Sequence, residues 1–98
     1  MRFYIKGKVL GVEDENDVVA FGDKLTKVAS LIIQPNDGED PICAKCFGKD
    51  KLAVCKEYLR SQKPMEMILT LSGRVIPASE KYPVPKYINE VHLKWVLR

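Results

Sequence analysis

The stretch CFGKDKLAVCKEYLR, residues 46–60, holds the most informative local pattern of the chain. An apolar segment ends in Phe-Gly-Lys, and an amphipathic segment follows at once. In that segment Leu52, Cys55 and Leu59 have the i, i+3, i+7 spacing of a helix with one apolar face. The stretch therefore predicts a strand that passes directly into a short helix.

The limits of this helix can also be predicted. Asp50 is the expected N-cap, because its carboxylate can accept the free N–H groups of the first turn. We expect the helix to end near Ser61, since Pro64 follows and cannot continue a helix.

Apolar residues alternate on both sides of the helix and predict five strands. In the strand before it, Ile42, Ala44 and Cys46 face one way, whereas Cys43, Lys45 and Phe47 face the other. Residues 13–24 are expected to form an acidic loop with room for a short strand at 18–21. An all-β fold with one helix between the third and fourth strands matches the five-stranded oligonucleotide-binding (OB) barrel, although other five-stranded domains share parts of this order. The predicted strands cover residues 3–12, 25–34, 41–47, 65–76 and 87–97, and a loop with three prolines covers 77–86.

Residues 41–97 resemble the bacterial and phage single-stranded-DNA-binding protein family. The family's third strand ends in an aromatic-Gly-Lys step, its helix begins with Leu-Ala, and its last strand reads Tyr-Thr-Thr-Glu-Val. The matching segments here are Phe47-Gly48-Lys49, Leu52-Ala53, Glu57-Tyr58-Leu59-Arg60, the strand 67–75 and Tyr87-Ile88-Asn89-Glu90-Val91.

The resemblance implies an OB fold that holds unpaired DNA by stacking bases on aromatic rings. This chain differs from the family in three respects. The first 40 residues match only loosely. Pro41 and the segment after the fourth strand stand where the family often has tryptophans, so stacking would depend on Phe47 and Tyr82. The family's acidic C-terminal tip does not follow Arg98, which suggests a minimal form such as those of phages, plasmids or accessory primosomal proteins.

Composition and charge fit one soluble domain over residues 1–98. Of the chain 46% is hydrophobic and 30% charged, and no apolar run approaches the roughly 20 residues that cross a membrane. The N-terminus does not have the pattern of a signal peptide. The odd number of cysteines, three, argues against a disulfide framework and for the reducing cytoplasm of a bacterial host cell.

The net charge of +3 is unevenly distributed. Residues 13–40 carry eight acids and two bases, so the rest of the chain has a balance of +9. The acids concentrate in residues 13–17 and 37–40. This pattern suits a protein that presents one basic side to a polyanion, although the acidic segments can equally be solvated turns.

The predicted contacts to nucleic acid centre on Phe47, which lies between Lys45 and Lys49 in the sequence. A ring flanked by cations offers both stacking and phosphate neutralisation; the alternative is that Phe47 belongs to the core. Trp95 is expected in the core or in a subunit interface. The remaining candidate contacts are Lys6, Lys8, Lys27, Arg74, Tyr82 and Lys86. The alternative for Arg74 is a solvated charge without a nucleic-acid contact. The alternative for the loop around Tyr82 is that its prolines only stiffen a long connection.

A metal site has to be considered, because Cys43, Cys46, Cys55 and His92 offer a set of ligands that zinc accepts. Cys43 and Cys46 lie on opposite faces of a regular strand, however, and Cys55 lies in the apolar stripe of the helix. We expect two small buried residues and one exposed thiol, with no metal and no cofactor. The single histidine has no nucleophile near it in sequence, so no catalytic residues are predicted and the chain is not expected to be an enzyme.

The first hypothesis is a protein that binds single-stranded DNA, or RNA, without sequence preference during replication or recombination. It would act as a homodimer or homotetramer, with replication proteins as further partners and no association with membranes. The alternative is an OB-fold module for protein interactions in a replication, primosome or conjugation complex.

Overall fold

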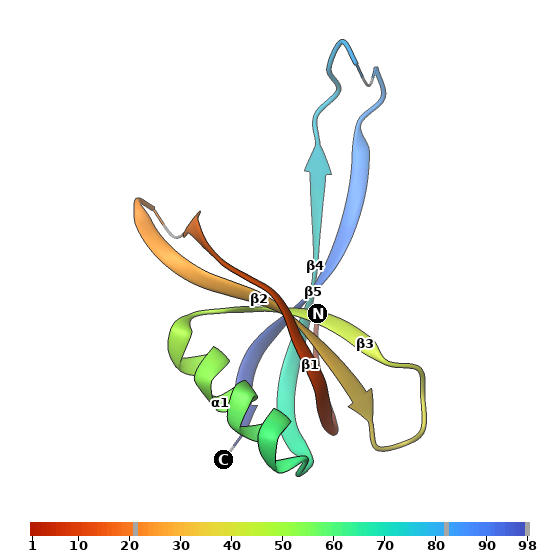
Figure 1. Cartoon of the computed structure of the whole chain (residues 1–98). Helices are drawn as coiled ribbons and strands as arrows, with labels where there is room; N and C mark the ends of the chain where they lie inside the picture. Colours follow the sequence, from red (N-terminus) through yellow and green to blue (C-terminus); the bar gives the residue numbers. More distant parts are fainter. Residues whose placement is uncertain (21, 82, 98) are drawn as a thin grey trace.

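Five strands close into a barrel in the order β1-β2-β3-β5-β4. The structure is a computed structural model and describes residues 1–20, 22–81 and 83–97. Its neighbouring strands are antiparallel except for β3 and β5, which are parallel. Its elements are β1 (Arg2–Ala20), β2 (Lys24–Pro35), β3 (Ile42–Phe47), α1 (Lys49–Ser61), β4 (Met65–Ile76) and β5 (Lys86–Leu97) (Figure 1). A closed five-stranded barrel with a helix between β3 and β4 is the OB fold, so the predicted fold is confirmed.

The core is formed by the inward-facing residues of all five strands and by one face of α1. Every second side chain points inward along β3 and, as far as Leu69, along β4, as predicted, whereas Leu71 and Val75 farther along β4 are exposed. In α1, Leu52 and Cys55 are buried and Leu59 packs against the core, which confirms the predicted apolar stripe. The core residues are Val9, Ala29, Leu31, Ile33, Ala44, Cys46, Leu52, Cys55, Met65, Met67, Leu69 and Leu93.

Two hairpins, β1–β2 and β4–β5, extend beyond the barrel (Figure 1). The predicted loop over residues 13–24 is therefore wrong, because β1 continues to Ala20 and pairs with β2 as far as Lys24. The short strand expected at 18–21 is found at 18–20, as the end of β1. The pairing shifts register between Glu13 and Asn16, where Asp14 has a positive φ of 53°. Such a bulge accommodates an extra residue without ending the strand. The acidic side chains are tolerated in this strand because they are exposed in the hairpin and stay solvated.

The helix starts at a different residue from the one predicted. Gly48 is the N-cap and makes no side-chain capping bond, so the prediction of Asp50 as N-cap is wrong. Gly48 has a φ of 104°, which a residue without Cβ adopts at little cost, and its N–H donates to the Lys27 carbonyl at 2.8 Å. This turn lets β3 pass into α1 within one residue. Asp50 therefore lies in the first turn of α1, where its carboxylate interacts favourably with the helix dipole.

The helix ends as predicted. Ser61 is its last residue, and Gln62 follows in the left-handed conformation with its N–H donating to the Tyr58 carbonyl at 2.9 Å. Among the described residues, no helix is long and apolar enough to cross a membrane.

Candidate nucleic-acid interface

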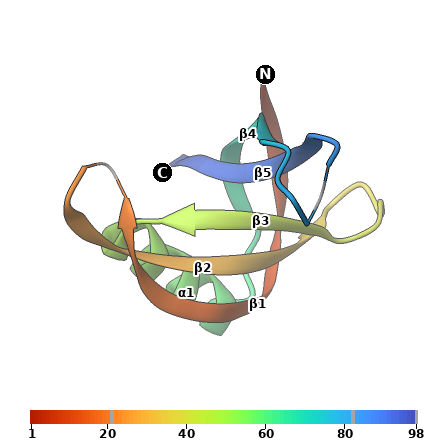
Figure 2. The same cartoon turned by 90° about the horizontal axis from the view of Figure 1, so that it is seen from above.

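Phe47 lies on the outer surface of the barrel, on the face of β3 that the alternation predicts. It is half-buried, because its ring packs against the ring of His92 with 5.3 Å between the centroids and a tilt of 55°. His92 comes from β5, which runs parallel to β3 and places His92 opposite Lys45. Figure 2 shows β5, β3, β2 and β1 in this order across one side of the molecule.

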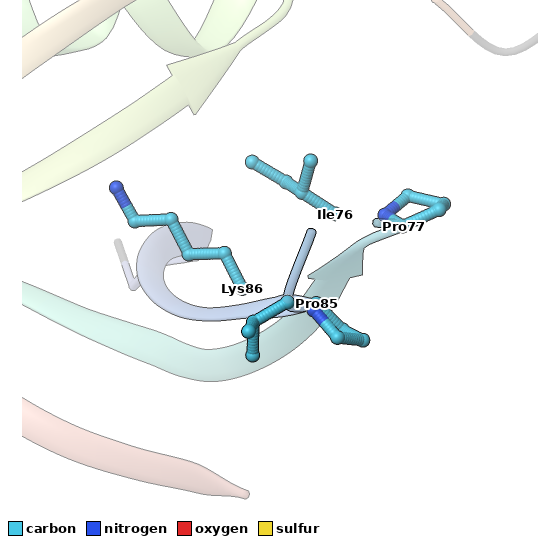
Figure 3. Close-up of a pocket in the computed structure, with 5 residues that line it drawn as sticks. Ile76, Pro77, Pro85 and Lys86 are labelled. Carbon is cyan, nitrogen blue, oxygen red and sulfur yellow. The ribbon is translucent and has the colours of Figure 1, made fainter. Parts of the chain in front are cut away.

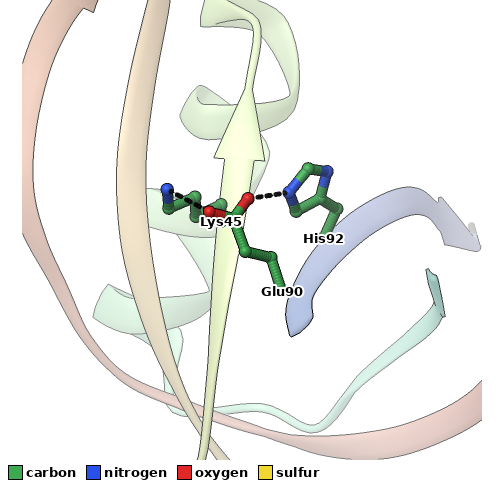
Figure 4. A network of polar contacts seen from close by, with 3 residues as sticks. All are labelled: Lys45, Glu90 and His92. Carbon is green, nitrogen blue, oxygen red and sulfur yellow. Dashed lines mark hydrogen bonds and ion pairs between the residues drawn. The ribbon is translucent and has the colours of Figure 1, made fainter. Parts of the chain in front are cut away.

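A carboxylate connects Lys45 to His92 (Figure 4). The Lys45 Nζ lies 3.2 Å from Glu90 Oε1, and His92 Nε2 lies 3.0 Å from Glu90 Oε2. The Glu90 side chain is only 18% exposed, so this contact is partly shielded from solvent. Glu90 therefore offsets much of the charge of Lys45 and holds the imidazole against Phe47.

A basic hollow with a volume of about 420 Å³ begins beside Phe47. Three cationic residues line it, Arg2 from β1, Lys51 from α1 and Lys94 from β5, and its described lining includes no carboxylate. The Lys51 Nζ donates to the carbonyls of Leu93 and Lys94 at 3.3 and 3.2 Å, which fixes the ammonium in place without neutralising it. The hollow thus combines one accessible aromatic ring with positive charge that no lining acid offsets.

None of these three cations was among the residues predicted from sequence. Their convergence depends on the pairing of β1 with β4 and of β4 with β5, which brings Arg2, Thr70 and His92 into one row. A single sequence carries no signal for such non-local pairing.

Lys27 and Lys49 lie together on the other side of Gly48. Both line a second shallow hollow at the base of the β1–β2 hairpin, and Asp17 lines it with them. The Lys27 Nζ is 3.5 Å from Asp17 Oδ1, so part of its charge is offset as well. These two lysines lie in a separate hollow from the one that Arg2, Lys51 and Lys94 line.

The other predicted contacts lie apart from Phe47 or outside the described residues. Lys6 and Lys8 are exposed on β1, opposite Glu66 of β4 and Gln34 of β2. Lys86 lies at the loop end of the β4–β5 hairpin, beside an apolar pocket that Ile76, Pro77 and Pro85 also line (Figure 3). The side chain of Arg74 and the whole of Tyr82 lie outside the described part of the chain.

The cysteines behave as packing residues. Cys46 and Cys55 are buried and Cys43 is exposed, which confirms the prediction of two buried residues and one exposed thiol. A hydrogen bond with Cys46, together with burial, raises the pKa of the Cys55 thiol, so it stays protonated and packs as an apolar group. Among the described residues, no three or more His, Cys, Asp or Glu side chains cluster in a way that could hold a metal ion.

Trp95 does not belong to the core, so that part of its prediction is wrong. A register shift between Ile68 and Leu69 pairs Leu69 with Leu93 but Ile68 with Trp95. Lys94 is the extra residue of this bulge, and a one-residue shift moves the following side chains to the opposite face. As a result Trp95 is 46% exposed, whereas Leu93 is buried.

A comparison with protein-family models and a comparison with curated proteins both find no match for this chain.

Proposed function

We propose that this protein binds single-stranded DNA without sequence preference. The observation that supports this function best is the half-buried ring of Phe47 in a hollow that Arg2, Lys51 and Lys94 also line, with no acid among its described lining residues. Stacking of a base on an aromatic ring contributes about 1–3 kcal/mol and tolerates any sequence. Cations beside the ring can neutralise the phosphates of the same strand.

The arrangement favours an unpaired strand over a duplex. Bases in a duplex stack on one another and offer no free face to a ring such as Phe47, whereas unpaired bases can turn outward. OB folds bind oligonucleotides over the outer surface around β2 and β3. Phe47 lies on this surface, in β3, whereas the cations of the hollow come from β1, α1 and β5. Protection of unpaired strands in replication or recombination, by a homodimer or homotetramer, is the biological role that we propose on this basis.

A module for protein interactions is the second candidate, and the β4–β5 hairpin favours it. Val75, Val84 and Tyr87 are more than half exposed there, and Ile76 and Val84 line the apolar pocket of Figure 3. In this alternative the hairpin would dock on a protein of a replication, primosome or conjugation complex. Such an apolar contact would keep its affinity in high salt.

Salt dependence separates the two candidates. Three phosphates neutralised on a single strand predict a slope of about −2 for the logarithm of the association constant against the logarithm of the salt concentration. We expect affinity for a labelled oligo-dT of about 35 nucleotides to fall about 20-fold between roughly 50 and 200 mM salt. Fluorescence anisotropy measures this loss, with a duplex of equal length as the control.

The expected result is salt-sensitive binding to the single strand and much weaker binding to the duplex. Equal affinity for both would contradict recognition of unpaired bases. If micromolar protein bound neither, nucleic-acid binding would be excluded, and the protein-docking alternative would become the leading candidate.

A further inference from the structure

Trp95 lies on the outer face of the sheet that β1, β4 and β5 form. It is opposite Ile68 of β4, and Ile68 is opposite Tyr4 of β1. The next row along these strands holds His92, Thr70 and Arg2 in the same order. The two rows are two residues apart on β4, which corresponds to about 7 Å.

Two cations lie over the Trp95 ring. The guanidinium carbon of Arg2 is 4.9 Å from a ring centroid of Trp95, and the Lys94 Nζ is 5.4 Å from one. Arg2 and Lys94 also line the basic hollow that begins beside Phe47. Arg2 and Lys94 therefore lie between two aromatic residues: they line the hollow together with Phe47, and they cover the ring of Trp95, which does not line it.

We propose that Trp95 is a second nucleobase-stacking site and that a single strand runs from Phe47 through the basic hollow to Trp95. This inference rests on the proposed function and adds a defined path to it. A cation–π contact on an exposed ring is weaker than the stacking of a base. An arriving base can therefore displace one of the cations from the ring, and that cation can then pair with the adjacent phosphate.

The charges of this surface favour nucleic acid over a second copy of the chain. A two-fold interface places the same patch on both subunits, so that residues near the axis meet their own counterparts. Arg2 and Lys94 would then face Arg2 and Lys94 of the other copy. The neighbouring acid, Glu66, already accepts a hydrogen bond of 2.6 Å from the Tyr4 hydroxyl. A polyanion meets no such repulsion.

Trp95 is the only tryptophan of the chain, so intrinsic fluorescence reports on this site alone. Titration with unlabelled oligo-dT is expected to change its emission with the same midpoint that anisotropy gives for binding. Trp95→Leu should weaken binding about tenfold, whereas Trp95→Phe, which retains a ring, should weaken it less than threefold. Leu97→Ala, at an exposed apolar residue of the same strand, is the matched control and should leave the affinity unchanged.

Each other outcome overturns the inference in a recognisable way. Anisotropy could show binding while the Trp95 emission stays constant and the affinity of Trp95→Leu is unchanged. The proposed function would then stand, but Trp95 would not lie on the path of the single strand. If sedimentation showed that Trp95→Leu dissociates an oligomer while its affinity for oligo-dT is unchanged, the ring would be a contact between copies. If the wild-type protein bound no single strand at all, the proposed function and this inference would both be wrong.

Discussion

Gly7→Ala is expected to lower the free energy of unfolding by about 3 kcal/mol, at the upper end of the usual range for overpacking. A Cβ at residue 7 would lie 2.5 Å from the carbonyl oxygen of Gln34, 3.0 Å from its carbonyl carbon and 3.1 Å from the Cα of Pro35. All three are backbone atoms, so no side-chain rotation relieves the clash. Gly7 also pairs with both Pro35 of β2 and Met65 of β4, so β1 cannot shift there without disturbing two ladders at once.

Urea denaturation followed by circular dichroism measures this loss. Gly11→Ala is the matched control on the same strand, because its Cβ would meet only the Ile32 Cγ1 at 3.9 Å, an ordinary contact. We expect the control to unfold at nearly the wild-type urea concentration and Gly7→Ala at a much lower one. Equal midpoints for the two variants would show that β1 and β2 are not as close as the structure has them.

Phe47→Ala is expected to weaken binding of single-stranded DNA about 10- to 100-fold. Loss of one stacked base is worth about 1–3 kcal/mol, and each 1.4 kcal/mol corresponds to a factor of ten. The substitution also removes the support of the His92 ring, which packs on Phe47 at 5.3 Å. Phe47→Tyr retains both the ring and this packing, so its affinity should stay within about threefold of wild type.

Anisotropy with oligo-dT measures these affinities, once circular dichroism has shown that each variant is folded. Leu10→Ala is the control, because Leu10 is 48% exposed and does not line the basic hollow. Wild-type affinity in Phe47→Ala would mean that Phe47 is a packing residue, and stacking would then have to occur elsewhere on the barrel.

The fold could be predicted largely because its local patterns are regular. Met65, Met67 and Leu69 alternate without interruption along β4, and all three are buried. The helix has its apolar residues at helical spacing, and it lies between the third and fourth strands, as in the OB barrel. These features depend only on neighbouring residues, which is why a single sequence shows them.

Two of the wrong predictions from the sequence concern strands. In one a bulge changes the alternation of side chains, and in the other an acidic segment, whose composition is unfavourable for a strand, is nevertheless part of one. Trp95 follows Leu93 at a spacing of two, which predicts the same face, but the bulge at Lys94 turns the ring outward. The acidic segment 13–17 has a low strand propensity, yet pairing with β2 keeps it in β1. Cross-strand pairing decides both cases, and composition does not reveal it.

The candidate site was predicted only in part for the same reason. Phe47 and Lys45 belong to one short strand, so their common face follows from alternation. Arg2, Lys51 and Lys94 come from three elements that meet only in the closed barrel. Because Glu90 pairs with Lys45, the basic character of the site lies mainly in those three residues, which sequence reasoning did not single out.

A titration of ¹⁵N-labelled protein with oligo-dT, followed by heteronuclear NMR, would show directly whether a single strand binds at this surface. We expect the amide signals of Phe47, Lys51, His92 and Lys94 to shift progressively and saturate. The signals of the acidic segment at residues 37–40, which does not line the hollow, should stay in place. Shifts confined to the exposed apolar residues of the β4–β5 hairpin (Val75, Ile76, Val84 and Tyr87), or no shifts at saturating oligo-dT, would contradict binding of a single strand at this surface.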